Sequence, residues 1–79
     1  MNLFVANINR EVNEDSLKSL FAEVGEVTSV RIAINDVTGQ SKGFGFVEMP
    51  NEKSATDAIK KLSNTYRFGK TLVVSKSRP

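Results

Sequence analysis

An octapeptide of aromatic and charged residues, KGFGFVEM at positions 42–49, holds the side chains best suited to bind a ligand. In an extended strand alternate side chains share a face, so Phe44 and Phe46 would lie beside Lys42 and Glu48. Flat aromatic rings can stack on other flat rings, and an ammonium group attracts anions. A single carboxylate among phenylalanines does not form a general acid–base pair. The pattern therefore indicates binding rather than catalysis.

The composition of the chain excludes most enzyme chemistries. Its 79 residues include no cysteine and no histidine, so the commonest metal ligand and the commonest general base are both missing. We therefore expect no catalysis, no cofactor and no metal. The length predicts one domain over residues 1–79. No apolar run reaches membrane-spanning length and the N-terminal segment has no signal-type stretch, so we expect a cytoplasmic protein without a membrane partner.

The elements that would position the octapeptide follow one another as strand, helix, strand, strand, helix and strand. We expect strands at 2–7, 26–35, 42–49 and 71–77, and helices that begin after the N-caps Asn13 and Asn51. Each helix has one apolar stripe, so two helices can cover only one face of a sheet. This predicts an α+β fold, a ferredoxin-like βαββαβ sandwich with a four-stranded antiparallel sheet and two helices on one face. The other face would meet solvent or a partner.

Strand alternation separates the residues that face the helices from those on the open face. The aliphatic residues are the better core candidates. We therefore expect the core to contain Leu3, Val5, Val30, Ile32, Ile34, Val47, Met49, Leu72 and Val74. The open face would then carry Phe4, Arg31, Phe44, Phe46, Glu48, Val73 and Ser75. An unpaired carboxylate at Glu48 would be expensive to bury, which argues against the alternative that these phenylalanines belong to the core.

Several other residues have expected places. Phe21 lies on the apolar stripe of the first helix and should be buried. Tyr66 lies in a turn-rich connection, where we expect it to pack on its neighbours, with stacking on a nucleotide as the alternative. Gly43 and Gly45 would leave room for close helix packing. Lys76 has the alternation of a core residue and should escape to solvent at the end of its strand.

The octapeptide resembles the octamer signature of the RNA-recognition motif family, Lys/Arg-Gly-Phe/Tyr-Gly/Ala-Phe-Val-x-Phe/Tyr, at seven of eight positions. Met49 replaces an aromatic residue at the eighth position. The segment LFVANI at 3–8 resembles the hexamer signature of the family's first strand, with Ala6 where glycine is more usual. The resemblance covers essentially the whole chain. It implies binding of single-stranded RNA on the exposed sheet face, by base stacking and by lysine and arginine contacts to phosphates.

Carried over position by position, the resemblance implies a role for individual residues. Phe4 and Phe44 would each stack on a base, Phe46 would pack against a sugar or between nucleotides, and Lys42 would contact a phosphate. Glu48 would accept a hydrogen bond from a base, or it would be an ordinary strand-surface charge or a partner for Lys42. Phe68 matches an apolar family position and is expected in the core. The weaker candidates, placed by alternation or by nearness to strand ends, are Arg31, Lys70, Val73, Ser75, Lys76 and Arg78.

The alternative function is a protein-interaction module on the same fold. Members of the family that bind peptides usually lack the sheet aromatics and have an Arg-x-Phe turn before the last strand. Here Arg67 directly precedes Phe68, and the aromatics are present. The expected partner is therefore single-stranded RNA or single-stranded DNA. We expect a monomer, with homodimerisation through the aromatic face as a variant to be tested.

Overall fold

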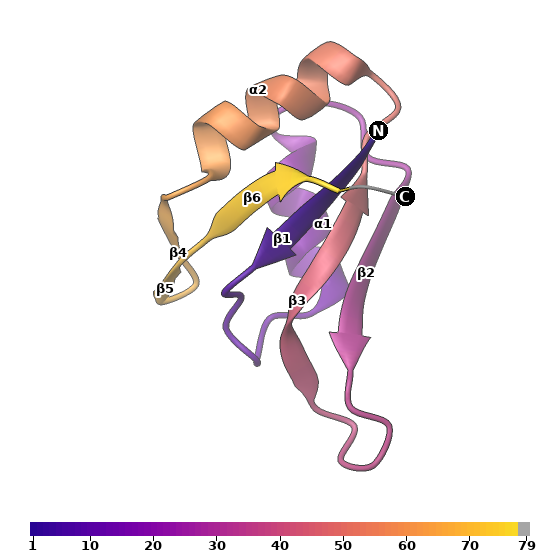
Figure 1. The fold of residues 1–79 in the computed structure, drawn as a ribbon, viewed down its shortest axis with the longest axis vertical. Coiled ribbons are helices and arrows are strands. Elements are labelled where there is room, and N and C mark those ends of the chain that lie inside the picture. Colours follow the sequence, from indigo (N-terminus) through magenta and orange to yellow (C-terminus); the bar gives the residue numbers. More distant parts are fainter. Residues whose placement is uncertain (78–79) are drawn as a thin grey trace.

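A four-stranded antiparallel sheet forms one layer of the protein, which is described over residues 1–77 by a computed structural model. The strand order is β2-β3-β1-β6, so β1 and β3 are the central neighbours (Figure 1). This arrangement confirms the predicted fold class. The strands span Asn2–Ala6 (β1), Ser29–Ile34 (β2), Ser41–Glu48 (β3) and Val73–Lys76 (β6).

Two helices, α1 (Glu14–Ala22) and α2 (Glu52–Leu62), form the second layer. Each begins as predicted. The side-chain oxygen of Asn13 accepts a hydrogen bond from the Ser16 backbone N–H at 2.8 Å, and that of Asn51 accepts one from Ser54 at 3.0 Å. These caps satisfy N–H groups that a helix start leaves without partners. Within residues 1–77, neither helix is long and apolar enough to span a membrane.

The core lies between the helices and one face of the sheet. The predicted core residues of three strands are buried as expected, and so is Phe21. In β2, Ile32 is buried as expected, but Val30 is only partly buried and Ile34 has 53% of its surface exposed. The pairing of β2 with β3 shifts between Ile32 and Ile34, and Ile34 lines an open hollow together with residues 10–14, which lead into α1. Together the buried residues form one cluster, which comprises Leu3, Val5, Ile8, Leu17, Leu20, Phe21, Ile32, Val47, Met49, Ala55, Ala58, Leu62, Leu72 and Val74.

A small hairpin replaces the irregular connection predicted before the last strand. It consists of β4 (Tyr66–Arg67) and β5 (Lys70–Thr71), and the last strand of the main sheet begins only at Val73. Phe68 and Gly69 form its turn with φ values of 54° and 81°, as a two-residue type I′ turn requires. At this turn the Phe68 side chain is 38% exposed, so its predicted burial is wrong. The predicted packing of Tyr66 is also wrong, because that side chain is 74% exposed.

The two glycines of the octapeptide serve the sheet and not the helices. A Cβ atom on Gly45 would overlap the carbonyl oxygen of Arg31 on β2 and lie 3.0 Å from the Ile32 Cα. Gly43 has a φ of +85°, and its carbonyl accepts a 2.8 Å hydrogen bond from the Ile8 N–H. The expectation that these glycines make room for helix packing is therefore wrong. They allow β3 to approach β2 closely and to turn locally beside the end of β1.

Candidate nucleic-acid interface

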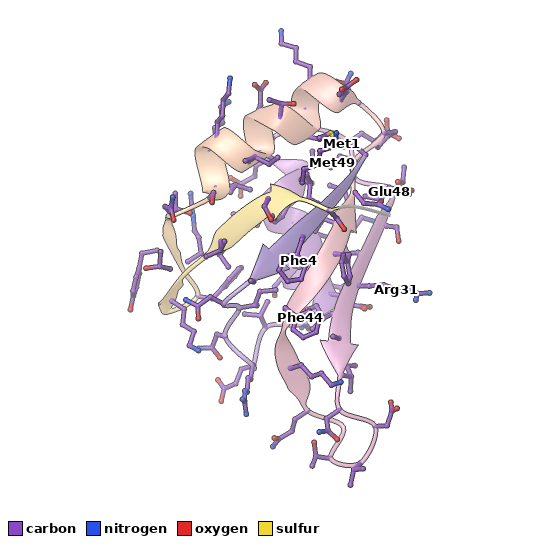
Figure 2. All side chains as sticks on the ribbon, viewed as in Figure 1. Met1, Phe4, Arg31, Phe44, Glu48 and Met49 are labelled. Atoms are coloured by element: carbon purple, nitrogen blue, oxygen red, sulfur yellow. The ribbon has the colours of Figure 1, made fainter. Side chains whose placement is uncertain are left out.

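Three phenylalanines lie together on the sheet face opposite the helices. Phe4 comes from β1, and Phe44 and Phe46 come from the adjacent strand β3. The centroid of the Phe4 ring lies 5.8 Å from that of Phe44, with 43° between the ring planes. It lies 5.5 Å from that of Phe46, with 56° between the planes. Figure 2 shows Phe4 and Phe44 in front of the sheet, with α1 behind it. We call these three residues the aromatic platform; tilted contacts at such distances hold the rings in place.

The strand register extends the aromatic platform sideways across the sheet. Phe4 lies directly opposite Phe46 on one side and Ser75 of β6 on the other, and Arg31 of β2 lies opposite Phe46. Arg31 and Ser75 therefore share one cross-sheet row with two of the rings. Val73 lies opposite Ala6 on the same face and is 43% exposed. The structure thus brings these sequence-predicted residues together on one surface.

Two of the weaker candidates are not part of this surface. Lys76 lies opposite the buried Leu3, so it has the alternation of the helix side, although its side chain is exposed at the strand end as expected. Its register places it away from the aromatic platform. Arg78 lies outside the described residues.

Cationic residues gather at one end of the aromatic platform. A hollow of about 320 Å³ there is lined by Phe4 and Phe44 and by three cationic side chains, Arg10, Lys42 and Lys70. All three are exposed. Lys42 belongs to the octapeptide, and Lys70 was expected from its nearness to a strand end. Arg10 was missed, because it lies in the loop after β1 and no alternation applies to a loop residue. Its position two residues after the hexamer-like segment was the only signal in the sequence.

The opposite end of the open face is polar and carries the carboxylate. A hollow of about 260 Å³ is lined by Asn2, Ser29, Arg31, Phe46 and Glu48. The alternative in which Glu48 pairs with Lys42 does not occur, because these residues lie six positions apart on one strand, roughly 20 Å.

The carboxylate of Glu48 has a different partner. Its Oε1 atom accepts a 2.8 Å hydrogen bond from the Thr28 hydroxyl, just before β2. The face therefore has a cationic end and a carboxylate end, with the aromatic platform between them.

An antiparallel sheet with helices on one face and clustered aromatic residues on the other is the architecture of a class of single-stranded nucleic-acid binding domains. The chain belongs to the RNA recognition motif family, whose sequence profile matches residues 3–73.

Relatives of known name or structure agree with this assignment. The candidate RNA-binding protein RbpB of Nostoc sp. is 39% identical over 79 residues, which are 100% of this chain and 77% of the relative. The crystal structure of RNA-binding protein PG1 is 42% identical, with a TM-score of 0.93 over 100% of this chain and 98% of that chain. The Sex-lethal protein–RNA complex is 33% identical, with a TM-score of 0.93 over 99% of this chain and 47% of that one.

Proposed function

We propose that this protein binds single-stranded RNA across the open face of its sheet and catalyses no reaction. The observation that carries the proposal is the aromatic platform, in which rings from two central strands lie within 6 Å of one another on the uncovered face. Unpaired bases stack on such rings, and each stacked base contributes about 1–3 kcal/mol. In this proposal Phe4 and Phe44 each stack on a base, and Phe46 packs against a sugar or between nucleotides.

The cationic hollow beside the aromatic platform suits the phosphate backbone. Arg10, Lys42 and Lys70 line the same hollow as Phe44, so a nucleotide stacked on that ring would have its phosphates near three cations. Attraction of phosphates by such groups supplies affinity without sequence preference. Arg31 and Ser75 extend the contact surface along the Phe4–Phe46 row. The relatives named for RNA binding, and the Sex-lethal domain solved with RNA, support the same conclusion.

We further propose that residues 1–79 act as one binding module, as a monomer in the cytoplasm. A monomer leaves the aromatic platform free for a nucleic acid, whereas a dimer formed through this face would cover it. Sizing of the protein at two concentrations, with and without an oligonucleotide, distinguishes these states.

The decisive experiment is a titration of short fluorescent oligonucleotides with Phe44→Ala and wild-type protein. We expect the variant to bind RNA about 5- to 160-fold more weakly, which corresponds to the loss of one stacked base. Phe68→Ala is the control, because it removes the same ring from a partly exposed position that lines a hollow against α1, on the helix side. Parallel titrations with DNA of the same sequence test the choice between RNA and single-stranded DNA.

Circular dichroism must show that both variants are folded. If folded Phe44→Ala binds RNA as tightly as the wild type, the aromatic platform is not the RNA-binding surface and the proposal fails.

A further inference from the structure

We infer that the hollow at the carboxylate end of the open face is a guanine subsite, in which Glu48 reads the base. The inference rests on the proposed RNA binding and adds a base preference to it. The hollow has a volume of about 260 Å³ and is bordered by the Phe46 ring. Sites for drug-sized ligands measure about 300–1,000 Å³, so a hollow of this size suits a single planar base.

The geometry of the subsite follows from the strand register. Glu48 lies between Ser29 of β2 and Asn2 of β1, each directly opposite it. In the next row Phe46 lies opposite Arg31. Arg31 is therefore the diagonal neighbour of Glu48, at a separation that long side chains bridge. A base against Phe46 would meet a carboxylate and a guanidinium along adjacent parts of its edge.

The carboxylate is held in place and retains capacity to accept hydrogen bonds. The Thr28 hydroxyl donates to Glu48 Oε1 at 2.8 Å, which restricts the rotation of an otherwise exposed side chain. An ionised carboxylate offers about four lone-pair sites on its two oxygens. The bond to Thr28 occupies one of them, so both oxygens can still accept from a ligand.

Among the four RNA bases, guanine best matches a carboxylate. Its Watson–Crick edge carries two adjacent N–H donors, at N1 and N2, which one carboxylate can accept with both oxygens. Adenine, cytosine and uracil each present a single donor group next to an acceptor on that edge, so the second carboxylate oxygen would face a lone pair. Guanine O6 and N7 lie next along the base and are acceptors that arginine binds in pairs. Glu48 and Arg31 are neighbours on the sheet, so Glu48 could accept from N1 and N2 of guanine while Arg31 donates to O6 and N7.

A carboxylate on this surface otherwise opposes RNA binding, because it repels phosphates and the carbonyl oxygens of uracil. Because of this repulsion, removing the Glu48 charge should have opposite effects on the affinities for two kinds of strand. Removing the charge should weaken binding of a guanine-containing strand and strengthen binding of a strand made only of uridine. A residue that is only a solvated surface charge would shift both affinities in the same direction.

The test uses three octanucleotides: one of uridine alone, one with a single central guanosine, and one with inosine in that place. Inosine lacks only the N2 amino group. We expect the wild type to bind the guanosine strand at least about fivefold more tightly than either of the others. Glu48→Gln keeps one acceptor oxygen, so it should lose the difference between guanosine and inosine. Glu48→Ala should lose the preference for guanosine over uridine and bind the all-uridine strand more tightly than the wild type does.

Phe44→Ala separates this inference from the proposed function. It should weaken binding of all three strands and leave their ratios unchanged. If the wild type binds all three strands equally, or if Glu48→Ala keeps the guanosine preference, the guanine subsite is refuted while RNA binding stands. If no strand binds, or if Phe44→Ala has no effect, the proposed function itself fails.

Discussion

At the residue scale, the phenylalanines divide between the core and the open face. Phe21 is fully buried in the core, whereas Phe46 keeps 41% of its surface exposed on the open face. Burial of an aromatic side chain stabilises the folded state, and truncating a buried one to alanine costs about 3–5 kcal/mol. The Phe46 ring is partly exposed to water in the free protein, so it is available to contact a ligand.

This difference predicts how two truncations affect stability. Phe21→Ala should lower the free energy of unfolding by about 3–5 kcal/mol. Phe46→Ala should lower it by only about 1–2 kcal/mol, since 41% of the residue is exposed already, while it weakens RNA binding. Urea denaturation followed by circular dichroism measures both. Equal losses for the two variants would mean that Phe46 is a structural residue and not part of a binding surface.

At the element scale, the open face depends on the close pairing of β3 with β2. The absence of a side chain at Gly45 lets the two backbones approach, and the register then places Arg31 opposite Phe46. Any displacement of β2 would move Arg31 away from Phe46, and would move Ser29 and Thr28 away from Glu48. Gly45 therefore positions the residues of the site although it carries no side chain that could bind a ligand.

Gly45→Ala should destabilise the protein by about 1–3 kcal/mol or more, because the added methyl group overlaps strand backbone that cannot rotate away. Gly39→Ala is the matched control. Gly39 has open space around it and a φ of +74°, so its substitution adds only conformational strain of about 1 kcal/mol. Thermal and urea unfolding test whether Gly45→Ala is less stable than Gly39→Ala. A Gly45→Ala protein as stable as Gly39→Ala would show that β2 and β3 can separate at low cost.

The elements also show how far the sequence could be interpreted. Alternation placed Phe4, Phe44 and Phe46 correctly, because the strands that carry them are regular and one side of each is plainly aliphatic. It placed Ile34 wrongly, because a shift in pairing next to the end of β2 cannot be seen in a period of two. Phe68 was misplaced because a left-handed turn residue with an aromatic side chain is uncommon.

The roles of other residues depended on contacts between distant parts of the chain. Arg10 lies in a loop, and only the fold brings it beside Lys42 and Lys70. The steric role of Gly45 depends on the backbone of β2, and the partner of Glu48 is a threonine twenty positions earlier. No local pattern specifies such long-range contacts. The sequence therefore predicted which side of the sheet carries the site, but not the division of that side into a cationic and a carboxylate end.

At the scale of the whole molecule, the net charge of +2 conceals an uneven distribution. Glu14 and Asp15 lie in the first turn of α1, in the layer behind the sheet. Arg10, Lys42 and Lys70 meet at one end of the open face. Because charges farther apart than a Debye length are screened, a nucleic acid on the open face responds to the nearby cations more than to the total.

This distribution predicts a salt dependence set by local cations. The logarithm of the RNA affinity should fall linearly with the logarithm of salt concentration, with a slope of about −0.7 per phosphate contacted. Arg10→Gln and Lys42→Gln should each make the slope shallower by about 0.7 if each residue contacts one phosphate. Lys61→Gln, which removes the same charge from the exposed end of α2, should leave it unchanged. Equal effects of all three substitutions on the slope would mean that the affinity depends only on the total charge of the protein. The cationic hollow would then not be the site of phosphate binding.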